Sequence, residues 1–204
     1  MPQSGSLLVA NPLLPDPNFD RTVVLLIAHN EEGALGLVLN RPSKMEVAEP
    51  LPQWEHLAAE PAVLFLGGPV RHEAVICLAR NLPGVSGTAA TTAAPPIDGT
   101  DDTDDDDDDE GWKEVVPGVA TIDLDQDPGA VADRVRQVRM FAGYAGWSAG
   151  QLEAEIATGA WWIVDAEPAD AFTLEPADLW ERVLRRQSFP LAYVSWYPDD
   201  PTHQ

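Results

Sequence analysis

The sharpest chemical pattern in the chain is Gly-Trp-Ser-Ala-Gly at residues 146–150, which matches the G-x-S-x-G sequence around the nucleophile of many serine hydrolases. A strand predicted before it and a helix predicted after it supply the context that this pattern needs. A triad in the order serine, acid, histidine would need His203, the second residue from the C-terminus. Chain ends are rarely held within the roughly 3 Å that a general base requires. A helix cap at Ser148, with Gln151 three residues later as in a capping box, explains the same residues. The serine hydrolase therefore remains the alternative to a non-enzymatic protein.

Metal and cofactor chemistry finds no support in the residue pattern. The chain has four histidines and one cysteine, namely His29, His56, His72, His203 and Cys77. Their spacing fits no zinc site. The run of six aspartates at 104–109 lacks the glycine and terminal glutamate of a calcium loop, so it predicts diffuse counterions. We expect no metal and no cofactor, and we expect Cys77 to be a small core residue.

Polar residues and glycines at the ends of predicted elements mark a candidate binding surface. Arg41 follows a predicted strand, and it could pair with Glu153 on a predicted helix or help to form a small polar pocket beside glycine turns. Gly67 and Gly68 follow another predicted strand, where they either let strands approach closely or face a ligand. Their spacing fits no phosphate-binding loop. The candidate binding residues are Asn40, Arg41, Gly67, Gly68, Gln151 and Glu153.

The charge balance narrows the classes of partner. The 204 residues carry a net charge of −22, with 34 acids against 12 bases. Ten of the acids lie between Asp98 and Glu110, which leaves 24 acids against 12 bases elsewhere. An acidic body disfavours nucleic acids and anionic membranes, since both are bound through Lys and Arg. Two arginine trios are candidate basic patches, and the second is predicted at a helix C-terminus, where cations complement the helix dipole. The trios are Arg134, Arg136 and Arg139, and Arg182, Arg185 and Arg186.

Features of the chain predict a cytoplasmic protein. A single cysteine is typical of a reducing compartment. The N-terminal segment lacks a basic region, and its apolar stretch at 7–10 is far shorter than the roughly 7–15 residues of a signal peptide. No run approaches the roughly 20 apolar residues of a membrane helix. We expect a protein partner or a small ligand, and leave the oligomeric state open.

Apolar periodicity predicts a mixed α+β fold. Strands are expected at 22–29, 34–40, 62–67, 73–79, twice within 112–124, and at 139–146, 160–166 and 191–197. Helices are expected at 51–59, 128–135, 148–159 and 176–187. Strands come in pairs in the first half and mix with helices in the second, which favours α+β over a regular doubly wound sheet.

Residues 86–111 differ in composition from the rest of the chain. They are rich in Ser, Thr, Ala, Gly, Pro and Asp, and Ile97 is their one large apolar residue. Such a segment buries too little surface to offset the entropy of ordering it. We therefore predict a disordered acidic insert at 86–111 within a single domain that spans 1–204.

Three segments together resemble the YqgE/AlgH family of bacterial proteins. They are NPLLPDPNFDRTVVLLIAHNEEGALGLVLNRP (11–42), FLGGPV (65–70) and GYAGWSAGQLEAEI (143–156). The resemblance implies a bifurcated mixed sheet curled into a pseudo-barrel with flanking helices. The family is largely uncharacterised, and some members are labelled transcriptional regulators. This chain departs from it at Leu78-Ala79, where a Leu-His pair is frequent, and in the acidic insert. The resemblance favours a non-enzymatic protein that acts by binding a partner or a small ligand.

Overall fold

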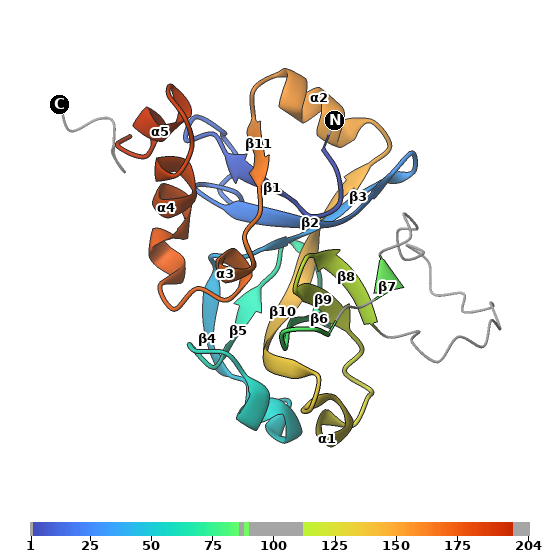
Figure 1. Ribbon diagram of the computed structural model, residues 1–204. Helices are drawn as coiled ribbons and strands as arrows, with labels where there is room; N and C mark the ends of the chain where they lie inside the picture. Colours follow the sequence, from blue (N-terminus) through green and yellow to red (C-terminus); the bar gives the residue numbers. More distant parts are fainter. Residues whose placement is uncertain (1, 86–87, 90–111, 198–204) are drawn as a thin grey trace.

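Strands dominate the structure, a computed structural model that describes residues 2–85, 88–89 and 112–197 (Figure 1). In these ranges they form one sheet with the path β11-β1-β2-β3-β10-β6-β9-β8-β7, and β4 and β5 branch from it at β10. The strands are β1 (Ser6–Ala10), β2 (Val23–Asn30), β3 (Gly33–Val38), β4 (Pro42–Glu46), β5 (Val63–Leu66), β6 (Val70–Asn81), β7 (Thr88–Ala89), β8 (Trp112–Val116), β9 (Val119–Ile122), β10 (Val135–Ser148) and β11 (Trp161–Asp165).

The long strand β10 is where the sheet divides. Its last residues pair antiparallel with β3, while its earlier residues pair antiparallel with β6 and parallel with β5. The two branches then curl away from each other, so that β1, β2 and β3 cross above β4, β5 and β6 in Figure 1. The prediction of a bifurcated mixed sheet is confirmed, and its curvature makes a half-barrel flanked by a few short helices.

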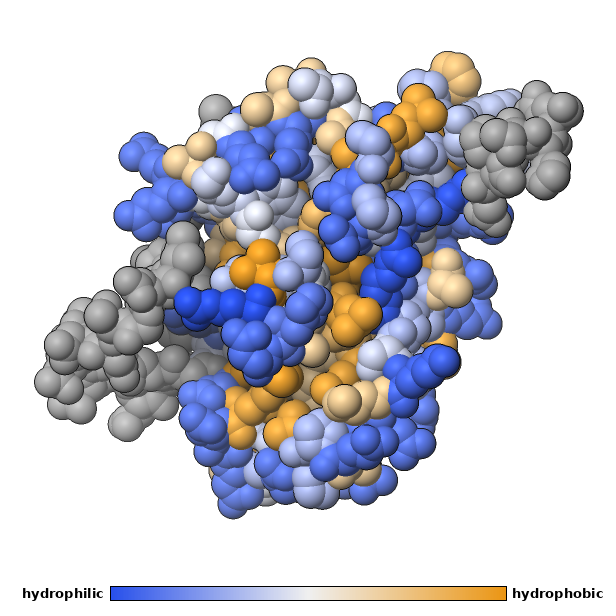
Figure 2. All heavy atoms as spheres, turned by 180° about the vertical axis from the view of Figure 1, so that it is seen from behind, coloured by the Kyte–Doolittle hydropathy of each residue, from blue (hydrophilic) through white to orange (hydrophobic). Residues whose placement is uncertain are grey.

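The apolar runs of the sequence form strands because both of their faces are covered. In β2, Val23 and Leu25 pack into one core cluster, and Val24 and Leu26 pack into another on the opposite face. A strand buried on both faces appears in sequence as a continuous apolar run, which is the pattern at 22–29. Seen from behind, hydrophilic residues cover much of the surface, and apolar residues show in a hollow down its middle (Figure 2).

The helices are short and lie around the sheet. In the described ranges, none is long and apolar enough to cross a membrane. Helix α4 buries the predicted apolar face of Leu179, Val183 and Leu184. The helices are η1 (Pro52–Leu57), α1 (Pro128–Val131), α2 (Gln151–Ala157), α3 (Pro168–Ala171), η2 (Pro176–Asp178), α4 (Leu179–Arg185) and α5 (Leu191–Val194).

The C-terminal segment corrects one sequence prediction. Residues 191–197 were expected to form a strand, but Leu191–Val194 is the helix α5. Leu191 and Val194, three residues apart, pack against the core, while Tyr193 and Trp196 are exposed. The two partly buried positions are three residues apart, a spacing that suits a helix, and the run of apolar residues obscured this spacing in the sequence.

The start of α2 corrects a second sequence prediction. Ser148 was expected to cap this helix, but it is the last residue of β10, and the cap residue is Gly150 in the left-handed conformation, with φ 72°. The strand continues two residues further than predicted because Ser148 pairs with Gly33 of β3.

Part of the predicted insert is described. Thr88 and Ala89 form β7, which pairs in parallel with β8, so these two residues belong to the sheet. The rest of the predicted disordered segment, 86–87 and 90–111, lies outside the described residues, as does His203.

Candidate functional site

A pocket of about 200 Å³ lies where three connections of the chain meet. The loop between β1 and β2 forms one wall, the end of β3 and the residue that precedes β4 form another, and the turn from β5 into β6 forms the third. The lining residues are Pro17, Asn18, Val38, Arg41, Leu66, Gly68, Pro69 and His72. The pocket therefore combines a guanidinium, an amide and an imidazole with an apolar wall.

Backbone hydrogen bonds hold these connections together. Leu66 N donates to Arg41 O over 2.8 Å, and Val38 N donates to Gly67 O over 2.8 Å. The Arg41 side chain reaches the first loop, where its Nη2 donates to Asp20 O over 2.6 Å. The loop, the strand end and the turn are thereby tied to one another, and Arg41 is oriented at their junction.

Gly67 and Gly68 let this turn lie directly on β10. A Cβ atom built on Gly67 would lie 2.2 Å from Gly143 O, and one built on Gly68 would lie 2.2 Å from Tyr144 C. No side chain fits either space, so close approach explains both glycines, as one of the two sequence interpretations proposed. Gly68 also lines the pocket, which agrees with the other interpretation, that this turn faces a ligand.

Asn40 does not line the pocket but secures the strand beside it. Its Oδ1 accepts from Val23 N over 3.0 Å, and its Nδ2 donates to Arg21 O over 2.8 Å. The side chain thus joins the end of β3 to the start of β2. This clamp fixes the backbone immediately before Arg41.

Gln151 and Glu153 lie at the opposite end of β3. Helix α2 follows Ser148, which pairs with Gly33 at the start of β3, whereas Arg41 comes after its end. At about 3.3 Å per residue, the length of β3 and the residues after it separates Arg41 from Gln151 and Glu153 by more than about 20 Å. The expected Arg41–Glu153 pair does not form. The six candidate residues therefore divide into a pocket group and a group on α2.

Glu153 has a different partner, His29 of β2. Glu153 Oε1 lies 2.7 Å from His29 Nε2, and His29 Nδ1 lies 3.0 Å from Pro2 O, so this pair also holds the N-terminal segment. A hydrogen bond from its own backbone N–H, and then the His29 ring, lower the pKa of Glu153 against the opposing effect of burial.

The lowered pKa of Glu153 gives a pH-dependent stability. A carboxyl group whose folded pKa is below its unfolded value stabilises the protein above that unfolded value, about 4.3, and loses this contribution as pH falls through the folded pKa. We expect Glu153→Gln to cost about 0.5 kcal/mol at pH 6, because its side chain is partly exposed, and nearly nothing at pH 3. Urea unfolding at both pH values measures the difference in unfolding free energy between the wild type and the variant, with Glu32→Gln at an exposed position as the control. A difference that widens in acid would contradict the assignment.

Ser148 is engaged in a local contact. Its Oγ lies 3.1 Å from Gln151 Oε1, and the same oxygen accepts from Ser148 N over 3.1 Å. His29 lies on β2, two strands away from β10, and its two ring nitrogens contact Pro2 O and Glu153 Oε1. A cap at Ser148 would have bonded its hydroxyl to the Gln151 backbone N–H, but the hydroxyl instead contacts the Gln151 side-chain amide. Nothing in this arrangement supports a hydrolase.

A carboxylate on α2 holds the neighbouring aromatic residues. Glu155 Oε2 accepts from Trp147 Nε1 over 2.9 Å and from Trp161 Nε1 over 2.8 Å, while its Oε1 accepts from Gln151 Nε2 over 3.0 Å. Phe19 stacks on the Trp147 ring and meets the Trp161 ring edge-on. Because both Glu155 oxygens already accept hydrogen bonds from these donors, the side chains around α2 form a packed structural cluster.

The first arginine trio does not form a basic patch. Arg139 is 2% exposed, and its guanidinium donates to Ala171 O over 3.1 Å, to Thr173 O over 3.0 Å and to Glu60 O. Burial lowers the pKa of Arg139 to about 10. Arg134, another member of the trio, stacks over the Trp112 ring at 4.4 Å.

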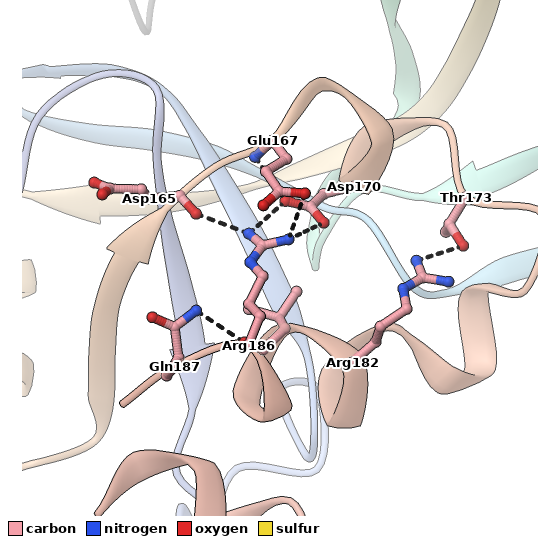
Figure 3. A network of polar contacts seen from close by, with 8 residues as sticks. Asp165, Glu167, Asp170, Thr173, Arg182, Arg186 and Gln187 are labelled. Carbon is pink, nitrogen blue, oxygen red and sulfur yellow. Dashed lines mark hydrogen bonds and ion pairs between the residues drawn. The ribbon is translucent and has the colours of Figure 1, made fainter. Parts of the chain in front are cut away.

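The second trio ends α4 as predicted, and its members contact the protein itself (Figure 3). Arg186 makes two 2.7 Å hydrogen bonds to the buried Asp170. Burial disfavours the charge of Arg186, but Asp170 together with Glu167 and Asp165 outweighs this effect, so the pKa of the guanidinium is raised. Arg182 donates to Thr173 Oγ1 over 2.7 Å, and Arg185 pairs with Glu181. The contacts of Arg186 and Arg182 fasten α4 to α3 and the segment after it, whereas the Arg185 pair lies within α4.

Metal-ligating side chains do not gather in the described part of the chain, where no group of three or more His, Cys, Asp or Glu could hold an ion. Cys77 is 1% exposed in β6, as expected of a core residue, and burial raises the pKa of its thiol well above the usual range.

The fold, together with the three family-like segments of the sequence, places the chain among bacterial proteins built on a forked, curled sheet. A family profile described as DUF179, AlgH-like matches residues 7–192, and the chain belongs to this family. A UPF0301 protein of Streptomyces coelicolor is 45% identical over 98% of this chain and 94% of its own length. A crystal structure of a Corynebacterium diphtheriae protein has a TM-score of 0.82 at 29% identity, covering 96% of this chain and 92% of its own. The solution structure of AlgH from Pseudomonas aeruginosa has a TM-score of 0.62 at 32% identity, covering 96% and 94%.

Two polar residues of the pocket were not predicted from the sequence. Asn18 and His72 line the pocket with Arg41, yet neither was a candidate binding residue. Asn18 lies within the family-like segment 11–42, and His72 comes two residues after the segment 65–70. Polar residues at the margins of these segments were the available signal, but their convergence depends on how the sheet curls.

Proposed function

We propose that this protein is a non-enzymatic cytoplasmic binding protein whose pocket at Arg41 takes a small ligand. The observation that carries the proposal is the convergence of Arg41, Asn18 and His72 with an apolar wall in one pocket of about 200 Å³. Concave sites with a mainly apolar lining and a few polar groups are the usual form of small-molecule sites.

Binding without catalysis fits the groups that line the pocket. None of the eight lining residues carries a hydroxyl or a thiol, so the pocket offers no conventional serine or cysteine nucleophile. Ser148, at the far end of β3, belongs to the α2 group. A regulatory role, of the kind with which some family members are labelled, would act through a protein partner, since the acidic body disfavours direct contact with DNA.

Filling the pocket tests this function. Leu66 is 44% exposed at the pocket, so Leu66→Trp adds bulk there with little cost to the core. We expect small fragments to shift the amide resonances of Gly68 and His72 in the wild type, and Leu66→Trp to abolish these shifts. Leu174→Trp is the matched control, because Leu174 is 73% exposed and lies outside the pocket.

Two results would overturn the proposal. One is a fragment library that leaves the pocket resonances of the wild type unchanged. The other is a folded Leu66→Trp variant that binds the same fragments as the wild type does.

A further inference from the structure

We infer that the ligand of this pocket is a small carboxylate with a short apolar body, its carboxylate bound by Arg41 and its body packed on Val38, Leu66 and Pro69. The inference rests on the proposed function and names the chemistry of the ligand.

Arg41 supplies a positive charge with donors to spare. Its Nη2 is bonded to Asp20 O, and within the described ranges no carboxylate pairs with its guanidinium. Arg186, by contrast, has both terminal nitrogens on Asp170. The hydrogen bond to Asp20 O orients the guanidinium and leaves its Nε and Nη1 groups to donate to a ligand. A planar guanidinium prefers a carboxylate or phosphate oxygen as its acceptor.

Neighbouring polar groups reinforce this preference. Asn18 and His72 line the same pocket, and an amide and an imidazole can each donate a hydrogen bond to an oxygen. Carboxylates occur nearby, on Asp16 and Asp20 of the same loop, but Asp16 Oδ1 accepts from Asn18 N over 2.9 Å and neither residue lines the pocket. The lining thus carries cationic and hydrogen-bonding groups without an acidic residue, in a chain whose net charge is −22.

The wall and the volume decide between kinds of anion. Pro17, Val38, Leu66 and Pro69 make half of the lining, so a ligand that is entirely polar would leave apolar surface unfilled. Phosphate groups are usually held by several backbone N–H groups together with a cation, and this pocket has one guanidinium. The volume of about 200 Å³ lies below the roughly 300–1,000 Å³ of sites for drug-sized molecules. These features favour a short monocarboxylate over a phosphate or a nucleotide.

The test compares isovalerate with its neutral isostere isovaleramide, and with inorganic phosphate, by NMR titration of the full chain. For so small a ligand we expect a Kd of about 1 mM for isovalerate, with shifts at Gly68 and His72. The amide should bind at least about tenfold more weakly, because it cannot make the charge-assisted hydrogen bonds to Arg41. Phosphate should shift these resonances less than isovalerate at the same concentration.

Variants assign the charge preference to one residue. We expect Arg41→Ala to weaken isovalerate binding by about tenfold or more, to leave isovaleramide binding little changed, and Arg41→Lys to restore part of the difference. Arg136→Ala, which removes an exposed arginine outside the pocket, is the control and should bind as the wild type does.

The outcomes separate the inference from the function on which it rests. Equal binding of acid and amide, tighter binding of phosphate, or an unchanged acid preference in Arg41→Ala would overturn the carboxylate assignment, while fragments that occupy the pocket would still support a binding protein. Failure of isovalerate while other fragments bind would also reject the assignment. A pocket that no fragment enters would reject both.

Discussion

Replacing Gly67 with alanine is expected to destabilise the protein by about 3 kcal/mol or more, at the upper end of the overpacking effects seen in protein cores. The new Cβ would lie 2.2 Å from Gly143 O and 3.1 Å from the Phe141 side chain. The clashing oxygen belongs to the backbone of β10, so no side-chain rotation relieves it. The turn must move away from β10, which would break the 2.8 Å hydrogen bond from Gly67 N to Ala142 O.

Gly118→Ala separates crowding from the conformational cost of losing a glycine. Gly118 has φ +83°, and nothing lies within 4 Å of a Cβ built there. Its substitution should cost about 1 kcal/mol, from left-handed strain alone. Urea unfolding of both variants measures the difference. If Gly67→Ala proved no less stable than Gly118→Ala, the close approach of the turn to β10 would be wrong.

Arg139→Ala is expected to cost about 3–5 kcal/mol, comparable to breaking a buried polar interaction. The substitution leaves the carbonyls of Ala171 and Thr173 without their guanidinium donor, removes the cation from the Phe65 ring at 4.4 Å, and opens a cavity. The two hydrogen bonds join β10 to the end of α3 and to the segment that follows it. Loss of Arg139 should therefore also loosen that segment, which hydrogen exchange at Phe172 and Thr173 can detect.

Arg139→Met distinguishes the polar contacts from the volume. Methionine fills much of the space without a buried charge, so we expect it to recover part of the loss and to remain about 1–2 kcal/mol below the wild type, since the carbonyls still lack a donor. Arg136→Ala, on the same strand but exposed, should change stability by less than about 0.5 kcal/mol. A methionine variant as stable as the wild type would show that the guanidinium contributes nothing beyond its volume.

Much of the sheet was predictable because its strands carry long apolar runs. The predicted strand at 22–29 overlaps β2 and the predicted strand at 160–166 contains β11, and both strands include buried apolar residues. Strands β1 and β4 escaped prediction: the apolar stretch of β1 is only four residues long, at 7–10, and β4 is mostly exposed at an edge of the sheet. Such segments show too little periodicity to be distinguished from loops, and pairing with longer strands stabilises them.

The candidate binding residues were predicted in part. Arg41 and Gly68 meet in the pocket, but Asn40 serves as a clamp, and Gln151 and Glu153 lie at the far end of β3. Polar strand ends were a sound indication of where loops gather. The sequence contained no indication of which ends share a side of the sheet, because this depends on the register and direction of pairing.

The family, the forked α+β fold class and the burial of Cys77 could all be predicted from the sequence alone. Those features follow from local composition and from the order of matched segments. The tertiary structure decided that Asn18, Arg41 and His72 share a pocket, that Ser148 contacts Gln151, and that Arg139 is buried while Arg136 is exposed. The physical reason is that these environments are set by contacts across the curled sheet, between residues far apart along the chain.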